Sequence, residues 1–339
     1  MVGPAPAVAR VRTAVRDLLT ALLVERQLRP DDLVLVACSG GPDSVALASQ
    51  VAFVAPRLGL RAGAVVVDHG LRPDSAAMAD LAARTCVGLG LDPVLTRRVP
   101  VPGGATETAA RSARYTELDA ARAATGAAGV LLGHTEDDQA ETVLLALGRG
   151  SGARSLAGMA PVRGAYWRPL LGVRRRDTHE VCDLLALPYE QDPSNAVDGP
   201  WRRADGGPVP RAAVRDSVLG SLADALGKDP VPALARTARL ARADADLLDQ
   251  LASAAWDRCV TVDGSLDVEA LAAEPEALRT RLLRRAAIDA GAPAGDLQEC
   301  HVAALAALVT HWRGQGEIAL PGGLIARRDC GRLVLAGAT

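Results

Sequence analysis

The chain has 339 residues, of which 49% are hydrophobic, so it is long enough for two domains with a substantial core. The formal net charge of −2 gives no sign that the whole surface binds nucleic acid, so an RNA site would have to be a local group of arginines. The six cysteines lie far apart without a CxxC pair, which argues against a zinc ribbon, an iron–sulfur site and a disulfide framework and favours a reduced, cytoplasmic protein.

The N-terminal segment is predicted to be an amphipathic helix, because apolar residues recur at helical spacing from Val8 to about Glu25. Charged residues interrupt it, and no later apolar run is long enough to span a bilayer, so we expect neither a signal peptide nor a membrane anchor. A buried strand is then predicted from Leu33 to Cys38, followed by a helix from Pro42 to about Phe53.

The turn between this strand and this helix, Ser39-Gly40-Gly41-Pro42-Asp43-Ser44, has the features of an anion-binding nest. Paired glycines allow consecutive backbone N–H groups to turn inward, and Pro42 suits the first position of a helix whose start carries partial positive charge. The hydroxyls of Ser39 and Ser44 are available to a phosphate, and Asp43 could hold Mg²⁺ against it. Alternatively, this is an ordinary tight turn in which Asp43 and Ser44 only stabilise the helix start.

The next predicted strand, Ala62 to Val67, also ends in polar residues, Asp68-His69-Gly70-Leu71-Arg72. Open α/β sheets bind ligands at the carboxyl ends of their strands, so Asp68 and His69 are candidate nucleotide-binding residues. His69 could equally be a structural residue of the turn.

Strands and helices continue to alternate, with a helix expected over Ser75–Leu89, a strand over Pro93–Val99 and a helix over Thr106–Ala123. This spacing predicts right-handed crossovers and an α/β fold built on a parallel, Rossmann-like sheet.

The helix over Thr106–Ala123 carries two arginines on one face, Arg111 and Arg114. Arginine at such a position is suited to a nucleotide phosphate or an RNA backbone. Arg111 could also be only the surface partner of Glu107, four residues earlier.

A short buried strand, Val130 to Gly133, is followed by the motif His134-Thr135-Glu136-Asp137-Asp138-Gln139-Ala140-Glu141-Thr142 at the start of a helix. Thr135 suits the N-cap and Asp138 completes a capping-box arrangement, which explains one or two of the carboxylates. It does not explain Asp137, Asp138 and Glu141 together, since these charges repel each other unless a cation lies among them. Mg²⁺ or a substrate ammonium would supply that cation.

The remaining chain is predicted to complete this domain and add a second one. After Arg149-Gly150-Ser151-Gly152 come a strand over Arg163–Arg168, a helix starting at Arg174-Arg175-Arg176 and a helix with Arg211 and Arg215 on one face. We expect residues 1–30 to be a helix packed on the catalytic domain, residues 31–220 to be that α/β domain, and residues 221–339 to be a mostly helical recognition domain with a small terminal β element.

Six motifs occur in a characteristic order. They are Ser39–Ser44, Asp68–Arg72, Glu107…Arg111…Arg114-Tyr115, Gly133–Thr142, Arg149–Gly152 and Asp192-Pro193-Ser194-Asn195. With this ordered set the chain resembles the bacterial tRNA(Ile)-lysidine synthases, which belong to the PP-loop superfamily of N-type ATP pyrophosphatases. The resemblance covers about residues 30–216 by motif and the helical half by layout. The chain departs from the family in the insertion-like loop from Gly199 to Pro210, which precedes Arg211 and Arg215.

The resemblance implies a two-step reaction. The C2 carbonyl oxygen of the wobble cytidine in a tRNA(Ile) with a CAU anticodon attacks the α-phosphate of ATP and releases pyrophosphate. Free L-lysine then displaces AMP to give lysidine, which changes the codon read from AUG to AUA. A homodimer is a further expectation.

The resemblance also implies roles for individual residues. Asp43 and Asp138 would be Mg²⁺ ligands, with Asp138 the base and Glu141 the ammonium anchor. The other expected catalytic residues are Arg211 and Arg215. ATP would contact Ser39, Gly40, Gly41, Pro42, Asp43, Ser44, Asp68, His69, Gly133 and His134, whereas lysine or tRNA would contact Arg111, Arg114, Asp137 and Arg149.

Three other functions would share the glycine turn. A tRNA thiolase of the same superfamily would normally need sulfur-carrying cysteines, and the chain has no CxxC pair. A small-molecule amidating synthetase would not need the helical domain, and a non-catalytic nucleotide sensor would not need the acidic cluster.

Overall fold

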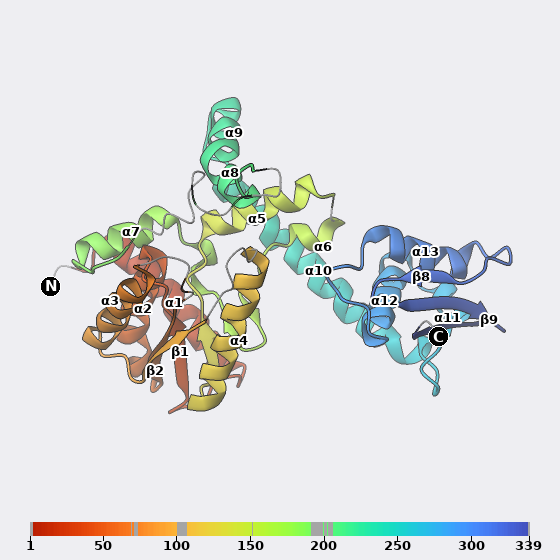
Figure 1. The fold of residues 1–339 in the computed structure, drawn as a ribbon, viewed down its shortest axis with the longest axis horizontal. Coiled ribbons are helices and arrows are strands. Elements are labelled where there is room, and N and C mark those ends of the chain that lie inside the picture. The colour runs from red at the N-terminus through yellow and green to blue at the C-terminus, as the bar shows by residue number, and fades with distance from the viewer. Residues whose placement is uncertain are drawn as a thin grey trace. The chain divides into compact units, whose positions relative to one another are not determined.

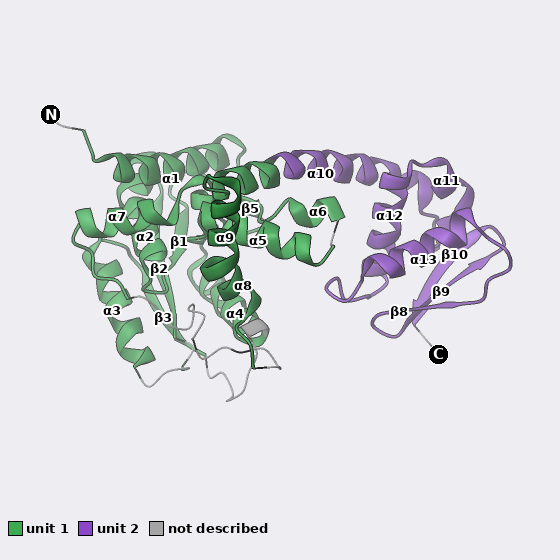
Figure 2. Cartoon of the chain, turned by 90° about the horizontal axis from the view of Figure 1, so that it is seen from above, with its two compact units in different colours: residues 1–239 green, residues 240–339 purple. Residues whose placement is uncertain are grey.

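The computed structural model describes residues 3–68, 70, 74–99, 107–150, 152–190, 199, 202 and 206–337 (Figure 1). The chain divides into two compact units, residues 1–239 and 240–339 (Figure 2). The domain limits expected from the sequence, at residues 30 and 220, stay predictions.

The first unit contains the predicted α/β sheet. Its strand order is β3-β2-β1-β4-β6-β5, and all neighbouring strands are parallel except β5 and β6. The strands are β1 (Leu33–Ala37), β2 (Arg61–Asp68), β3 (Val94–Arg98), β4 (Gly129–Leu131), β5 (Val162–Arg163) and β6 (Tyr166–Trp167). The order reverses at β1, because β2 and β3 lie on one side of it and β4 lies on the other.

Both faces of β1 are buried, which explains why its sequence is continuously apolar. Val34 and Val36 pack into a core formed with α1 (Pro6–Val24), α2 (Pro42–Val54) and α3 (Ser75–Gly88). Leu33 and Leu35 pack into a second core formed with α4 (Glu107–Thr125). Alternate residues of one strand therefore hold helices on opposite faces of the sheet.

The strand predicted over Arg163–Arg168 is wrong. The segment forms a short antiparallel hairpin in which Arg163 pairs with Tyr166. The chain reverses at Gly164, whose φ of +56° lies in the left-handed region that favours glycine. The second strand of the hairpin, β6, then runs parallel to β4 and continues into the 3₁₀ turn η2 (Pro169–Gly172).

The first unit contains other helical segments besides α1 to α4. They are η1 (Ala55–Leu58), α5 (Glu136–Gly148), α6 (Gly152–Leu156), α7 (Arg175–Leu184), α8 (Pro210–Ala213), the π-helical turn η4 (Val214–Val218) and α9 (Leu219–Leu226). Helix α10 (Val231–Cys259) then carries the chain into the second unit (Figure 2).

The second unit has its own hydrophobic core and a four-stranded antiparallel sheet of order β7-β10-β9-β8. Its elements after α10 are β7 (Leu266–Asp267), α11 (Val268–Ala273), α12 (Glu276–Asp289), α13 (Glu299–Thr310), β8 (Ile318–Leu320), β9 (Leu324–Asp329) and β10 (Arg332–Gly337). This arrangement confirms the predicted helices and terminal β element. Strand β7 was missed because two residues are too few to show a period in the sequence. Among the described residues, no helix combines the length and apolar character needed to cross a membrane.

Candidate active site

The turn Ser39–Ser44 lies at the carboxyl end of β1, where the strand order of the sheet reverses. This is the position at which open α/β sheets form a ligand-binding crevice. Gly40 has a φ of +84°, and Gly41 is the N-cap residue of α2, with Pro42 as its first helical residue. The local geometry expected from the paired glycines and the proline is therefore present.

Ser44 holds the turn in shape. Its hydroxyl accepts a hydrogen bond from the Ser39 backbone N–H (3.1 Å) and donates one to the Gly41 carbonyl (2.9 Å). Ser44 is 6% exposed, whereas Ser39 is exposed. Of the two predicted phosphate-binding hydroxyls, that of Ser39 is therefore the more accessible.

The carboxyl end of β4 lies directly against this turn. A Cβ atom on Gly133 would be 3.1 Å from the backbone carbonyl of Asp43 and 3.2 Å from the Cα of Ser44. Only glycine fits such a close approach without displacing the neighbouring backbone. Gly133 thus allows the turn after β1 and the motif after β4 to share one crevice.

The predicted capping box at the start of α5 is confirmed. The Thr135 hydroxyl accepts a hydrogen bond from the Asp138 backbone N–H (3.4 Å), and the Thr135 N–H donates to Oδ2 of Asp138 (2.8 Å). Asp138 is only 8% exposed, and its second oxygen, Oδ1, points away from the cap. One side chain therefore both caps the helix and contributes to the site.

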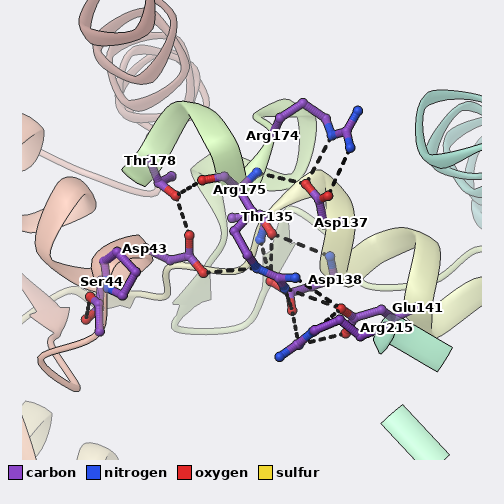
Figure 3. Close-up of polar contacts among 12 residues, drawn as sticks. Asp43, Ser44, Thr135, Asp137, Asp138, Glu141, Arg174, Arg175, Thr178 and Arg215 are labelled. Atoms are coloured by element: carbon purple, nitrogen blue, oxygen red, sulfur yellow. Dashed lines mark hydrogen bonds and ion pairs between the residues drawn. The ribbon is translucent and has the colours of Figure 1, made fainter. Parts of the chain in front are cut away.

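Arg175, the first residue of α7, joins the two halves of the site (Figure 3). Its Nη2 donates to Oδ1 of Asp138 (2.8 Å), its Nη1 lies 3.3 Å from Oε1 of Glu141, and its Nε lies 3.6 Å from Oδ2 of Asp43. Because Asp43 comes from the turn after β1 and the other two from α5, one guanidinium connects both predicted acidic groups.

Glu141 is fully buried and is paired by two further arginines. Arg215 makes two contacts with it, from Nε to Oε1 (2.7 Å) and from Nη2 to Oε2 (3.0 Å), and Arg211 lies 3.3 Å from Oε2. The sequence placed both arginines on one helix face beyond an insertion-like loop, and the structure brings both to Glu141.

Asp137 is paired by a fourth arginine, Arg174. The contacts run from Nη2 to Oδ1 and from Nε to Oδ2, both 3.1 Å, and the Arg175 backbone N–H donates to Oδ2 (2.8 Å). Arg174 also contacts Asp229, which lies just before α10. In this structure, arginines thus relieve the carboxylate repulsion for which the sequence interpretation invoked Mg²⁺ or an ammonium.

Sequence reasoning missed Arg174, Arg175 and Thr178, whose hydroxyl contacts Oδ1 of Asp43. A signal for the arginines was present. Positive side chains at a helix N-terminus are disfavoured by the helix dipole, so the run Arg174-Arg175-Arg176 at the start of a helix indicates acidic partners elsewhere in the fold.

The carboxylates have different proton affinities. Burial raises the pKa of Asp43. Burial alone would also raise the pKa of Asp138, but the charge of Arg175 and the hydrogen bond from the Thr135 N–H outweigh it and hold the pKa below its ordinary value. Asp138 is therefore the more firmly ionised of the two.

Around His134, which interacts with Asp138, lie buried nitrogen atoms that have no hydrogen-bond partner among the described residues. They are Nε of Arg114, Nε of Arg168 and Nδ1 of His134 itself. Burial, together with the charges of Arg168, Arg114 and Arg211, outweighs the opposing charge of Asp138 and lowers the pKa of His134 to about 3, so the imidazole is neutral. Buried donors without partners, close to several cations, are suited to an anionic ligand.

A family model described as a PP-loop domain matches residues 11–204, and one described as a TilS substrate binding domain matches residues 266–334. The chain is 51% identical to the tRNA(Ile)-lysidine synthase of Thermobifida fusca over 337 residues, which is 99% of each chain. It is 50% identical to that of Streptomyces coelicolor, over 98% of this chain and 99% of the relative. The chain belongs to the tRNA(Ile)-lysidine synthase family.

A solved structure shares the fold of this tRNA(Ile)-lysidine synthase family member. The U34-tRNA thiolase NcsA from Methanococcus maripaludis, solved with its [4Fe-4S] cluster, superposes with a TM-score of 0.54 at 17% identity and covers 70% of this chain and 79% of that one. The match confirms the predicted α/β PP-loop fold, and the PP-loop domain supports ATP as the nucleotide.

Other residues expected to act in this tRNA(Ile)-lysidine synthase family member lie at different distances from the crevice. Asp68 is buried at the end of β2, where its Oδ1 accepts the Gly70 N–H (2.9 Å). Arg111 is exposed, with its guanidinium 5.4 Å from the ring centre of Tyr115. Arg149 is the exposed C-cap residue of α5, roughly 16 Å from Asp138 along the helix axis. His69 and the Asp192–Asn195 motif lie outside the described residues.

Asp43 and Asp138 fit Mg²⁺ by chemistry. Mg²⁺ prefers hard oxygen ligands and is usually held by one or two carboxylates together with substrate phosphates. Both carboxylates contact the same guanidinium, which shows that they face a common cation position. Within the part of the chain that the structure describes, no group of three or more His, Cys, Asp or Glu side chains is arranged to hold a metal without such a substrate.

Proposed function

We propose that the chain joins L-lysine to C2 of the wobble cytidine of a tRNA(Ile) with a CAU anticodon, using ATP and forming an adenylated cytidine. The observation that carries this proposal is the link through Arg175 between the turn that would hold the phosphates and the acidic start of α5. A nucleotide bound at Ser39–Ser44 would place its phosphates beside carboxylates suited to an amine substrate.

In the first step, the cytidine O2 attacks the α-phosphorus of ATP, the bond to the β-phosphate oxygen breaks, and pyrophosphate leaves. The buried donors on Arg114, Arg168 and His134 support a role in holding the phosphoryl oxygens, since anions satisfy them. Asp43 and Asp138 would hold Mg²⁺, which supplies positive charge against the phosphates when bound. The target base must leave its stack to reach the crevice.

In the second step, the ε-amine of lysine attacks C2 and AMP leaves with the oxygen. The amine must first lose a proton, and we propose Asp138 as the acceptor, because it is 8% exposed whereas Glu141 is fully buried. Both oxygens of Glu141 are paired with arginine, so we propose that it positions Arg211 and Arg215. This differs from the role of ammonium anchor expected from the sequence. Asp138 is then the proposed contact of the lysine ammonium, whereas Asp137, both of whose oxygens are paired with Arg174, would position that arginine.

The second unit is the proposed tRNA-recognition domain, since the substrate-binding family model matches residues 266–334 within it. The product, lysidine, would change the codon read by the tRNA from AUG to AUA. A homodimer and a cytoplasmic location stay predictions.

The test is incorporation of labelled lysine into an unmodified tRNA(Ile) transcript with a CAU anticodon, with ATP and Mg²⁺ present. We expect incorporation by the wild-type chain, and a loss of at least about 100-fold in Asp43→Ala and in Asp138→Ala. The exposed Asp17→Ala is the control. Pyrophosphate release that depends on tRNA but not on lysine, without labelled product, would refute lysine as the nucleophile.

The same assay distinguishes lysine ligation from the alternative activity of a tRNA thiolase. Four of the six cysteines, Cys38, Cys86, Cys182 and Cys259, are buried, which does not suit a sulfur carrier that must reach a tRNA base, whereas Cys300 and Cys330 of the second unit are exposed. Sulfur incorporation into tRNA in place of lysine would favour the thiolase.

A further inference from the structure

Arg175 carries more contacts with the acidic cluster than either predicted catalytic arginine, and it is the guanidinium that contacts Asp43. We propose that Arg175 is a positioning residue that occupies the cation position between Asp43 and Asp138 and closes it to divalent cations until ATP binds, so that the metal enters with the nucleotide. This inference rests on the proposed function for the identity of the nucleotide and the metal.

The contacts of Arg175 are unequal. Its Nη2 makes a 2.8 Å hydrogen bond to Asp138, whereas its Nε is 3.6 Å from Asp43, which is an ion-pair distance without a hydrogen bond. The guanidinium can therefore leave Asp43 at a smaller cost than it can leave Asp138. Asp43 is the ligand that lies on the phosphate-binding turn.

The backbone of Arg175 is held while its side chain spans the crevice. Its N–H donates to Oδ2 of Asp137 (2.8 Å), and its carbonyl accepts from the Thr178 hydroxyl (2.6 Å). The same hydroxyl contacts Asp43. These bonds fix where the guanidinium can reach and keep it within range of the metal position after it releases Asp43.

The charges of the cluster explain why the metal would need the nucleotide. Three carboxylates, on Asp43, Asp138 and Glu141, meet three guanidiniums, on Arg175, Arg211 and Arg215. A divalent cation added to this balanced group would leave an excess of positive charge in a largely buried site. The phosphates of ATP remove that excess, so metal and nucleotide would bind cooperatively.

Removing Arg175 should allow the metal to bind independently of the nucleotide. In Arg175→Ala, Asp43 and Asp138 lose the cation that they share, so the pair should bind a divalent cation without ATP. The probe is Mn²⁺ alone, followed by the loss of the free-ion signal in electron paramagnetic resonance. We expect the Mn²⁺ dissociation constant without ATP to fall about tenfold or more relative to wild type, and the two proteins to differ little with ATP present.

The matched control is Arg176→Ala, which removes the exposed neighbouring arginine of α7 and should bind Mn²⁺ as wild type does. Arg175→Lys keeps the positive charge but cannot contact Asp43, Asp138 and Glu141 at once. We expect its Mn²⁺ dissociation constant to lie between those of wild type and Arg175→Ala. This variant also serves as the test if Arg175→Ala does not fold. Tight Mn²⁺ binding by the wild type without ATP would overturn the proposal, as would unchanged binding in the Arg175 variants. The titration uses neither tRNA nor lysine, so it tests the role of Arg175 even if the protein does not ligate lysine.

Discussion

Arg215 and Glu141, 74 residues apart in the chain, form a two-point ion pair with contacts of 2.7 and 3.0 Å around a carboxylate that is fully buried. A buried charge is tolerated only when it is paired and hydrogen-bonded. The pair therefore holds the helical segment after residue 210 against α5. It also fixes the positions of Arg211 and Arg215 at the crevice.

Removing Glu141 should be among the most destabilising changes in the site. We expect Glu141→Ala to lower the free energy of unfolding by about 3 kcal/mol, because it leaves the guanidiniums of Arg175, Arg211 and Arg215 without their common partner. Arg215→Ala should cost less, since two arginines remain and Arg215 is partly exposed. Urea denaturation of both single variants and the double variant should give a coupling energy of about 1 kcal/mol or more, and additive losses would contradict this.

Gly133→Ala should damage the site more than the fold. The added Cβ would press on the backbone of Asp43 and Ser44 and shift the phosphate-binding turn. We expect tRNA-dependent pyrophosphate release to fall by about 100-fold. The control is Gly148→Ala at the end of α5, where a Cβ meets no atom within 4 Å. Equal activity of the two variants would show that the close approach is not needed.

Thr135→Ala tests the capping box. The change removes the N-cap hydroxyl, so we expect a loss of about 1 kcal/mol in the free energy of unfolding. We also expect the Asp138 side chain to be held less firmly in its position. Lysine ligation should fall along with it, whereas Thr135→Ser, which keeps the hydroxyl, should restore both properties. Chemical denaturation and labelled-lysine incorporation measure the two effects. A loss of stability with full activity would separate the cap from the positioning of Asp138.

His134 should make the fold sensitive to acid. Its pKa is about 3 in the folded protein, against an ordinary value near 6.5 in the unfolded chain. As the pH falls below 6.5, the unfolded chain takes up a proton that the folded protein excludes, so stability is lost by up to about 1.4 kcal/mol per pH unit until pH 3.

The variant His134→Gln cannot take up that proton. Between pH 7 and pH 5 it should lose less free energy of unfolding than the wild type, by at most about 2 kcal/mol. Urea denaturation at the two pH values measures the difference, and equal losses would mean that the imidazole titrates freely in the folded protein.

Features that depend on neighbouring residues could be predicted from the sequence. The glycine turn follows from two glycines and a proline between a strand and a helix, and the capping box follows from Thr135 and Asp138 three residues apart. The alternation of strands and helices predicts the parallel sheet and so places the turn and the acidic motif at one edge. Each of these signals lies within a few residues or repeats with a fixed period.

The charge partners were decided by the tertiary structure. The acidic motif shows that compensating cations are needed, but not that Arg174, Arg175, Arg211 and Arg215 supply them from 34 to 74 residues further along the chain. Asp43 and Thr178 are 135 residues apart, and no periodic pattern connects them. An ion pair depends on distance in space, and helix periodicity relates side chains only three or four residues apart, so pairing across the crevice exists only once the chain has folded.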